Sequence, residues 1–282
     1  MMSRDSFTMT DALAPFGSVV LSVPHAGRDY DPALLAKLRV PEASIRGLED
    51  RYADRLAETA IAAGVPTIVA HAPRLVIDLN RGPDDLDHDY VADSPRTGAP
   101  TSARARSGLG LIPTRLWGVG SLWRGPFNAL DVAARLRQVH APYHETIDAA
   151  LAAARLRWGT ALLVDLHSMP PIGGAESPDI VIGDRFGASA GSILTAIAES
   201  HFKGLGFRVA INAPYAGGYI VTRHARPLAN IHALQIEVSR SLYLDAALDE
   251  VGPGLTRMQG VILGLVRSLT DELAAGIAQA AE

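Results

Sequence analysis

Short apolar runs alternate along this chain with longer stretches in which apolar residues recur every three or four positions. The short runs predict β-strands, and the longer stretches predict helices that bury one face. The expected strands lie at 18–23, 67–70, 75–79, 161–166, 179–182, 207–211 and 233–238. The expected helices lie at 50–63, 127–157, 189–201 and 255–273.

This alternation predicts an α/β fold with a mostly parallel central sheet, covered by helices on both faces in a three-layer αβα arrangement. The chain has 282 residues, and we expect them to form a single α/β domain over 1–282. The stretch 255–273 carries its apolar residues on one stripe, so we expect it to face the core. Pro142 predicts a kink or break within 127–157.

Composition narrows the possible partners. The chain is 48% hydrophobic and 20% charged, which is an ordinary globular mixture. Its formal net charge of −4 argues against nucleic acid as a partner, because phosphate binding favours a basic face. No run approaches the roughly 20 apolar residues of a membrane helix, and residues 1–17 lack the apolar segment of a signal peptide. We therefore expect a cytoplasmic protein without membrane partners.

The absence of cysteine restricts the chemistry. It excludes disulfides and thiolate metal ligands, so a bound metal must use His, Asp or Glu. The sequence also lacks the Gly-x-Ser-x-Gly motif of a serine nucleophile. If the protein is a hydrolase, a metal-activated water is the favoured nucleophile.

One stretch, 92–110, is rich in Ser, Gly, Ala and Pro and carries arginines without an apolar period. Long loops are uncommon in compact domains unless they have a role. We interpret this stretch as either a solvated loop or a flexible lid over a binding site.

Two histidines follow expected strands. His25 comes shortly after 18–23, and His167 directly follows 161–166. Ligands of open α/β sheets bind at the carboxyl ends of strands, so both histidines are candidate metal ligands, although each could instead be structural. Asp165 lies two positions before His167 on the same side of the strand, where it could support a metal-binding histidine.

A pair of acids stands at the expected start of the helix at 50–63. Asp50 and Glu49 could cap this helix or interact with its dipole, as acids at helix starts commonly do. The alternative is that one of them is a carboxylate metal ligand.

Glu237 interrupts the apolar run 233–238. A carboxylate at such a position is costly unless it is paired or points into a cleft. Catalytic carboxylates are placed in this way so that burial raises their pKa toward neutrality. We favour a catalytic role; the alternative is a structural ion pair with Arg240 or Arg223.

The expected strand at 75–79 is followed by an amide and a cation, Asn80 and Arg81, and is preceded by Arg74. A guanidinium group pairs with a carboxylate through two parallel hydrogen bonds, so these residues are candidates for binding a substrate carboxylate. The alternative is a surface salt bridge to a nearby acid, Asp84, Asp85 or Asp87.

A glycine-rich segment, 212–219, follows another expected strand and ends on Tyr219, with Arg223 shortly after it. It lacks the Gly-Lys-Ser/Thr ending of a phosphate-binding loop. Its glycines would let the backbone approach a small ligand closely, but an ordinary tight turn would have the same composition.

Taken together, these motifs resemble the N-formylglutamate amidohydrolase family, and the match runs in order from about residue 18 to about residue 245. The motifs are Ser-Val-Pro-His-Ala-Gly at 22–27, Asp-Leu-Asn-Arg at 78–81, Asp-Leu-His-Ser at 165–168, Asn-Ala-Pro-Tyr-Ala-Gly-Gly-Tyr at 212–219 and Gln-Ile-Glu-Val-Ser-Arg at 235–240. The resemblance implies a zinc-carboxypeptidase-like (phosphorylase/hydrolase-like) fold that is also similar to that of aspartoacylases.

The resemblance also implies one zinc ion per chain, held by two histidines and a carboxylate with a fourth position open to water. By motif, His25 and His167 are the histidine ligands, and Glu237 is the catalytic glutamate. Asn80 and Arg81 match the pair that binds the substrate carboxylate.

This sequence departs from the carboxypeptidase pattern because Arg28, rather than an acid, stands three residues after His25. The carboxylate ligand must therefore come from elsewhere. We expect Asp50, with Glu49 as the second choice.

The expected reaction is hydrolysis of an N-acyl amino acid, a small molecule. N-formyl-L-glutamate is the first choice of substrate, and its products, formate and glutamate, would place the reaction at the last step of one route of histidine breakdown. Arg74 or Arg223 would stabilise the oxyanion, and Tyr219 and Arg223 would contact substrate. Two alternatives are removal of an acetyl or succinyl group from an acidic amino acid, and binding of an anionic amino acid without turnover. The sequence gives no indication of oligomeric state.

Overall fold

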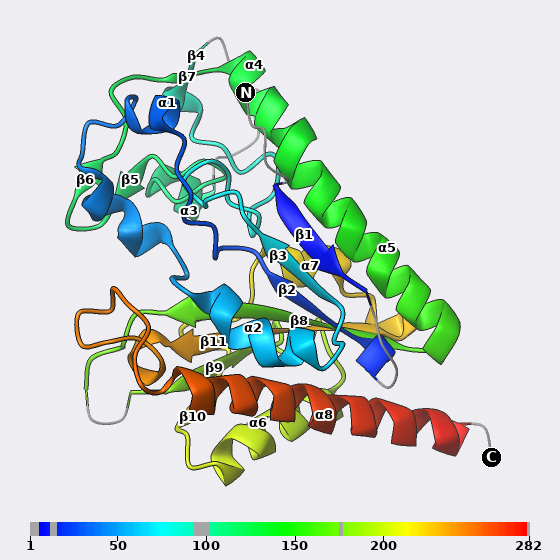
Figure 1. Ribbon diagram of the computed structural model, residues 1–282. Helices are drawn as coiled ribbons and strands as arrows, with labels where there is room; N and C mark the ends of the chain where they lie inside the picture. The colour runs from blue at the N-terminus through cyan, green and yellow to red at the C-terminus, as the bar shows by residue number, and fades with distance from the viewer. Residues whose placement is uncertain (1–5, 12–15, 93–101, 175–176, 281–282) are drawn as a thin grey trace. The chain divides into compact units, whose positions relative to one another are not determined.

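A computed structural model describes residues 6–11, 16–92, 102–174 and 177–280 (Figure 1). The chain divides into two compact units, each built from three separate stretches. One, here called the loop-rich unit, comprises Met1–Thr8, Pro24–Arg51 and Ala70–Glu145. The other, the sheet unit, comprises Met9–Val23, Tyr52–Val69 and Thr146–Glu282. A single domain over the whole chain stays a prediction.

The central sheet is mixed and mostly parallel. Among the described residues it has seven strands in the order β1-β3-β2-β8-β11-β9-β10. In this order the strands are Phe7–Thr10, Thr67–Ala70, Val19–Val23, Ala161–Met169, Ile231–Ser239, Ile180–Gly183 and Val209–Ile211. Pairs β2–β3, β2–β8, β8–β11 and β9–β10 are parallel, whereas β9 and β11 are antiparallel. Every residue of β2 and β8 is buried, as the uninterrupted apolar runs of parallel strands require.

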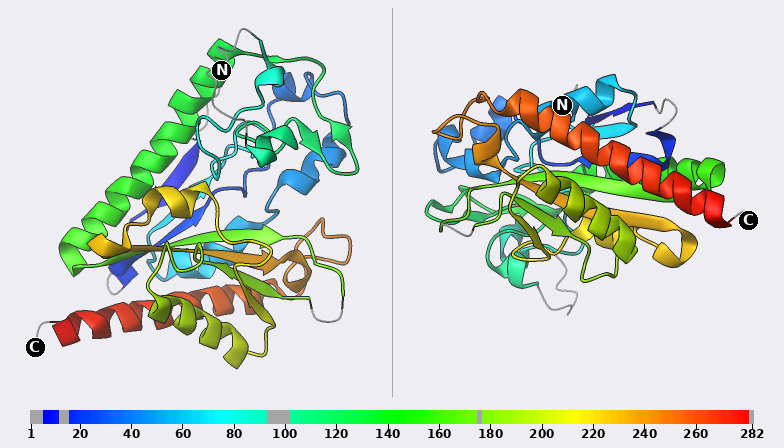
Figure 2. Two further views of the ribbon diagram at one scale, coloured as in Figure 1. Left: turned by 180° about the vertical axis from the view of Figure 1, so that it is seen from behind. Right: turned by 90° about the horizontal axis from the view of Figure 1, so that it is seen from below.

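Helices flank this sheet (Figures 1 and 2), which confirms the α/β class. The long helix α8 (Leu255–Ala280) packs against α2 (Ala53–Ala62) and α6 (Ser192–Gly204), and α7 (Tyr219–His224) packs against β8 and β11. The apolar stripe of α8 is buried, as its periodicity predicts; its members include Met258, Ile262, Leu265, Val266 and Leu269. Short 3₁₀ turns of this unit are Phe16–Ser18, Pro227–Ala229 and Arg240–Leu242.

The loop-rich unit has short elements and its own apolar core. Its helical segments are α1 (Pro32–Leu35), 3₁₀ turns at Glu42–Leu48 and His88–Tyr90, α3 (Ala103–Arg106), α4 (Ala129–Arg135), a π-helical turn at Leu136–His140 and the start of α5 (Ala141–Trp158). Its strands are β4 (Val91–Ala92), β5 (Arg115–Leu116), β6 (Gly120–Ser121) and β7 (Phe127–Asn128). Trp123 and Phe127 meet edge to face in the core at 4.8 Å, where Ile45, Leu75 and Leu122 are also buried.

The predicted strand at 75–79 is wrong: this segment is a series of turns. Its apolar residues are buried, but the backbone folds on itself, with Val76 N–H donating to the Pro73 carbonyl. The Asp78 carboxylate then accepts the Asn80 N–H at 2.9 Å, a local bond that competes with a strand ladder.

The boundaries of two predicted helices also differ. The helix expected from residue 50 begins at Ala53, because Tyr52 before it takes a left-handed backbone with φ 58°. The stretch 127–157 divides into β7, α4, the π-helical turn and α5. Pro142 falls in the first turn of α5, directly after the π-helical turn, and its missing N–H fits this local change in hydrogen bonding.

Part of the expected lid, 93–101, lies outside the described residues, so the lid stays a prediction. Within the rest of 92–110, Ser102 caps α3 by accepting the Ala105 N–H at 3.0 Å. Among the described helices, none combines the length and the apolar character that crossing a membrane requires.

Candidate metal centre

His25 lies two residues beyond the end of β2 and is buried, with 2% of its surface exposed. Its Nε2 is 2.8 Å from Asp78 Oδ1. Because a carboxylate accepts, Nε2 carries the hydrogen, and Nδ1 is left as the atom that could bind a metal. The chain turns tightly after it: a side chain at Gly27 would lie 2.4 Å from the His71 carbonyl, so only glycine fits.

Asp78 contacts both His25 and two arginines of the same unit. It is fully buried, and its Oδ2 is 2.8 Å from Arg74 Nε and 3.9 Å from Arg81 Nε. Burial by itself raises the pKa of Asp78, but the charges of Arg74 and Arg81 and the hydrogen bond from His25 outweigh it and hold this pKa well below its usual value. Asp78 is therefore an anion at neutral pH and a strong acceptor for His25.

The structure separates the two acids that the sequence left as alternative ligands. Glu49 accepts hydrogen bonds from the Tyr30 hydroxyl at 2.7 Å and from Arg51 Nη1 at 2.8 Å. Burial and the Glu49 charge raise the pKa of Tyr30, so the tyrosine remains a donor. Asp50 instead directs Oδ2 to within 3.5 Å of His25 Nδ1, and its backbone N–H donates to the His25 carbonyl at 3.0 Å.

His167 lies near the end of β8, and a carboxylate holds its ring as Asp78 holds that of His25. Its Nε2 is 2.8 Å from Asp165 Oδ2, the carboxylate that sequence spacing placed on the same side of the strand. Asp165 Oδ1 accepts a second hydrogen bond from Ser22 on β2 at 2.9 Å. Nδ1 of His167 is thus the ring nitrogen that could bind a metal.

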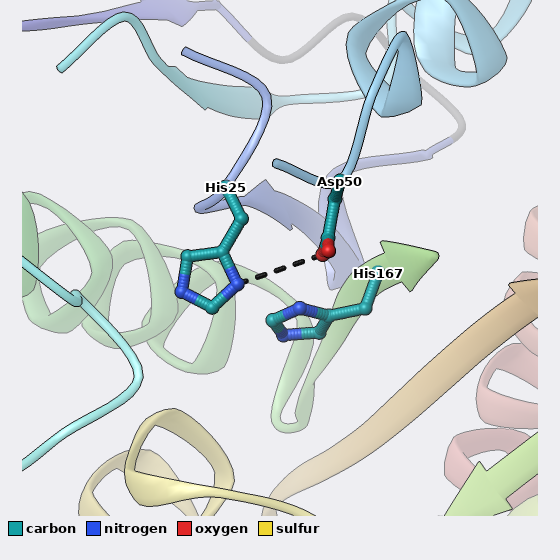
Figure 3. A group of neighbouring side chains, drawn as sticks. All are labelled: His25, Asp50 and His167. Atoms are coloured by element: carbon teal, nitrogen blue, oxygen red, sulfur yellow. Dashed lines mark ion pairs between the residues drawn. The ribbon is translucent and has the colours of Figure 1, made fainter. Parts of the chain in front are cut away.

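Figure 3 shows the side chains of His25, Asp50 and His167 converging, and each offers one ligand atom within 4.8 Å of the others. Two ligands about 2.1 Å from a tetrahedral zinc ion are separated by about 3.4 Å. The 3.5 Å between His25 Nδ1 and Asp50 Oδ2 agrees with that separation. These three buried residues could therefore hold a metal ion, and the chemistry of the donors suits zinc.

Glu237 lies in β11 opposite His167 of β8 in the parallel register. Residues at one register position of neighbouring strands point to the same side of a sheet, so Glu237 and His167 share a face. Glu237 is buried, and its Oε1 accepts a hydrogen bond from Gln235 Nε2 at 2.8 Å.

The structure shows other contacts for the two arginines that the sequence suggested as ion-pair partners of Glu237. Arg240 donates to the Ser168 hydroxyl at 3.1 Å. Arg223 is exposed and pairs with Asp148 at 3.0 Å, a carboxylate that also accepts from buried His224. Substrate and oxyanion roles for Arg223 stay predictions.

Gln235 also fixes the glycine-rich segment. Its Oε1 accepts the Gly218 N–H at 2.9 Å, just before Tyr219 opens α7. The close approach expected for this loop occurs at Gly217, where φ is 108° and a side chain would lie 2.7 Å from Val221. The role of Tyr219 in substrate binding stays a prediction.

Asn80 and Arg81 are buried next to Asp78. Arg81 donates from Nε to the Leu109 carbonyl at 2.9 Å and from Nη1 to the Asn80 carbonyl at 2.8 Å. Burial lowers the pKa of Arg81 but leaves a guanidinium that is cationic at neutral pH. Arg74 is held by Asp78, and its role at the oxyanion stays a prediction.

Sequence reasoning assigned no role to two residues that the structure shows to be orienting partners. Asp78 aligns His25, and Gln235 aligns Glu237. Both have a signal that could have been used, since each is a polar residue in an apolar run, and Gln235 lies two positions from Glu237 on the same strand face.

Two histidines and a carboxylate, with a buried glutamate opposite one of the histidines, could hold a metal ion and leave one coordination position open. The model of the N-formylglutamate amidohydrolase family matches residues 17–244. This chain belongs to that family.

Individual relatives of this chain have names that agree with this family. An N-formylglutamate deformylase from Pseudomonas aeruginosa is 32% identical over 234 residues, which cover 80% of this chain and 82% of the relative. A protein of the same name from Pseudomonas putida is 30% identical over the same shares. The crystal structure of N-formylglutamate amidohydrolase from Ralstonia eutropha JMP134 matches with a TM-score of 0.89 and 27% identity, over 97% of this chain and 100% of that one.

Proposed function

We propose that this protein hydrolyses the amide bond of N-formyl-L-glutamate to give formate and L-glutamate, and that it uses one zinc ion held by His25, Asp50 and His167. The observation that carries the proposal is the convergence of these three buried side chains in a chain of this family. The names of the relatives support the choice of substrate.

The donor set fits zinc in number, type and orientation. It consists of two neutral nitrogens and one carboxylate oxygen, and each histidine donates its other N–H to a buried carboxylate. Bound zinc would acidify a water molecule and polarise the amide carbonyl of the substrate.

Glu237 is the proposed general base. Its carboxylate would accept a proton from the attacking water and then deliver that proton to the leaving nitrogen, so that the amide bond breaks with a neutral amine as the leaving group. Gln235 holds one carboxylate oxygen of Glu237, which fixes the direction in which the other oxygen points.

Arg81, with Asn80, is the proposed site for a substrate carboxylate. The two backbone contacts of its guanidinium use Nε and Nη1, so Nη2 is the nitrogen proposed to meet the substrate. Arg74 is proposed to stabilise the negative charge that develops on the carbonyl oxygen, and Tyr219 and Arg223 to contact the rest of the substrate.

The proposal includes a three-layer, zinc-carboxypeptidase-like arrangement of the α/β fold. It also places the protein in the cytoplasm, in histidine breakdown, where N-formylglutamate would be consumed. The carboxypeptidase-like fold and the place in histidine breakdown follow from the family resemblance. The three layers and the cytoplasmic location follow from the pattern and composition of the sequence.

The test combines product release with metal content. Purified protein should release formate and glutamate from N-formyl-L-glutamate faster than it releases acetate or succinate from the acetyl and succinyl analogues, and it should contain about one zinc per chain by elemental analysis. The double variant His25→Ala, His167→Ala should lose both zinc and turnover. A matched control, His71→Ala with His232→Ala, changes two histidines outside the group and should retain both.

Each alternative has its own result. Faster cleavage of the acetyl or succinyl analogue would reassign the acyl group. Binding of glutamate without turnover or metal would favour a binding protein. Zinc that survives the double substitution would show that the ligands are wrong.

A further inference from the structure

Two buried histidines of the loop-rich unit, His140 and His144, have no part in the proposed reaction. His140 and His144 are 4% and 1% exposed, and their ring centroids are 4.4 Å apart. His140 Nε2 is 2.9 Å from the Arg81 carbonyl, and His144 Nε2 is 3.0 Å from the Leu79 carbonyl. The two carbonyls lie on either side of Asn80.

The direction of these bonds is fixed. A carbonyl oxygen can only accept, so both rings must carry their hydrogen on Nε2. Two imidazole rings thereby hold the backbone before and after Asn80, in a segment that is a turn rather than a strand and has no sheet ladder of its own.

The π-helical turn explains how this helix contacts the segment at three points. Arg135, at the end of α4, donates Nη1 to the Val76 carbonyl at 2.7 Å. In a regular α-helix, residues at intervals of four would share its face. The turn Leu136–His140 adds one residue, so the face continues instead through positions 140 and 144. Such turns are frequent at functional sites.

Two hydrogen bonds connect the histidine pair to the guanidinium of Arg81. His140 holds the Arg81 carbonyl, and the Asn80 carbonyl, between the two held positions, accepts Arg81 Nη1 at 2.8 Å. A shift of this backbone would therefore tilt the guanidinium. Asp78, which orients His25, has an additional anchor because its N–H donates to the Leu111 carbonyl at 2.7 Å.

We propose that His140 and His144 are positioning residues that hold Asn80 and Arg81 in the orientation needed to bind the substrate carboxylate. This inference rests on the proposed function. It predicts that losing either donor weakens substrate binding and carboxylate selectivity while zinc remains bound.

The experiment replaces each histidine by phenylalanine, which keeps the ring without the donor, and by glutamine, whose amide nitrogen can occupy the place of Nε2. His140→Phe and His144→Phe should each raise the KM for N-formyl-L-glutamate by about tenfold or more and change kcat by less than about threefold. The glutamine variants should stay within about threefold of wild type in KM. Zinc content should be unchanged throughout.

Two further readouts separate positioning from general damage. N-formyl-L-glutamine and N-formyl-L-isoglutamine each lack one of the two carboxylates, and the preference for N-formyl-L-glutamate over one of them should collapse in the phenylalanine variants. In an Arg81→Met background, His140→Phe should have little further effect, because its action passes through Arg81.

His201 provides a matched control, since it is a helix histidine that donates Nε2 to a backbone carbonyl, that of Val261, at 3.0 Å. His201→Phe should leave KM and selectivity unchanged. If a phenylalanine variant does not fold, His140→Asn or His144→Asn replaces it, because the asparagine amide is too short to reach the carbonyl.

Equal losses on all three substrates, additive effects with Arg81→Met, or glutamine variants as impaired as the phenylalanine variants would overturn the inference. Absence of turnover in wild type would instead overturn the proposed function. In that case the positioning role of the histidines is tested by the dissociation constant for L-glutamate, measured by calorimetry. Weaker binding in the phenylalanine variants would support the role, and an unchanged constant, or no binding by wild type, would overturn it.

Discussion

At the scale of single residues, the candidate site is built from donors whose direction is fixed by a second side chain. Asp78 orients His25, Asp165 orients His167, and Gln235 orients Glu237. A buried polar group is costly unless it is hydrogen-bonded, so each of these pairs also satisfies atoms that folding removes from water.

The proposed role of Glu237 as general base is tested by Glu237→Gln, which keeps the shape of the side chain and removes the proton acceptor. Turnover of N-formyl-L-glutamate should fall by about 10²–10⁴-fold, while zinc content stays at the wild-type level. Formate release and elemental analysis measure the two quantities. Glu145→Gln, on the exposed surface of α5, is the control and should be as active as wild type. Near-normal turnover of the Glu237 variant would remove it as the base.

Asp78→Asn tests the carboxylate that orients His25. The amide cannot supply the negative charge that His25, Arg74 and Arg81 face, so zinc affinity should fall by about 10–100-fold. Competition with a chelator measures the dissociation constant for zinc. Asp179, which pairs with Arg208 and is more exposed than Asp78, provides the control. Asp179→Asn should leave the dissociation constant for zinc unchanged. An unaltered zinc affinity in the Asp78 variant would contradict the orienting role.

At the scale of elements, local pattern is a good guide where the strand is buried in the sheet. The predicted runs around β2, β3, β8, β9, β10 and β11 are strands, and β8 and β11 extend beyond them. The polar residues His167 and Ser168 are still part of β8. In the sequence these polar residues indicate the end of a strand. The pattern of apolar residues cannot show that the neighbouring strand β11 continues past them.

The segment at 75–79 shows where pattern fails. A run of buried apolar residues occurs in turns as well as in strands. The backbone of this segment is instead decided by contacts distant in sequence, with Leu111, Arg135 and His144. β1 and α7 were also missed, because each is short and carries a weak period.

The apolar stripe of α8 predicts the effect of shortening one buried side chain. Leu265→Ala should lower the free energy of unfolding by about 2–5 kcal/mol, because it removes apolar contacts and leaves a cavity. Urea denaturation gives the value. Leu156→Ala, at an exposed leucine of α5, should change it by less than about 0.5 kcal/mol. Equal effects of the two substitutions would show that the stripe does not face the core.

The turn after β9 predicts a dependence of stability on pH. Asp184 accepts hydrogen bonds from Asn212 Nδ2 at 2.7 Å, Thr195 Oγ1 at 2.9 Å and the Gly187 N–H at 3.0 Å. Burial raises the pKa of Asp184, but these bonds outweigh it and hold the pKa below the usual value. A carboxyl group with a lowered pKa in the folded state contributes stability above its unfolded pKa of about 3.9, and this contribution is lost as the pH falls through the folded value.

Asp184→Asn should therefore lower the free energy of unfolding by about 1–2 kcal/mol at pH 7 and by clearly less at about pH 3. Urea denaturation of both proteins at the two pH values gives the comparison. Asp271→Asn, at an exposed position of α8, should have no effect at either pH. A difference between wild type and Asp184→Asn that is the same at both pH values would contradict the assignment.

At the scale of the whole molecule, the sequence predicts the fold class and the family better than it predicts geometry. Repeated alternation of strand and helix is sufficient for an α/β fold, and the order of five motifs is sufficient for the N-formylglutamate amidohydrolase family. That Asp50 rather than Glu49 lies with the two histidines is visible only in the folded chain, where Tyr30 and Arg51 hold Glu49.

The histidine pair could not be predicted for a related reason. Its position depends on one extra residue in a helical turn, and the bonds it makes are to backbone carbonyls, which leave no trace in the sequence of the segment that accepts them. Side chains that act on backbone are in general harder to infer than side chains that act on each other.

We propose above that zinc at His25, Asp50 and His167 makes this chain an N-formylglutamate hydrolase. The most direct measurement is the rate of formate release as zinc is added stepwise to chelator-treated, metal-free protein. We expect no formate release without metal, and a rate that rises with added zinc and levels off at about one zinc per chain. Full turnover without metal, or no turnover once zinc saturates the protein, would contradict this proposal.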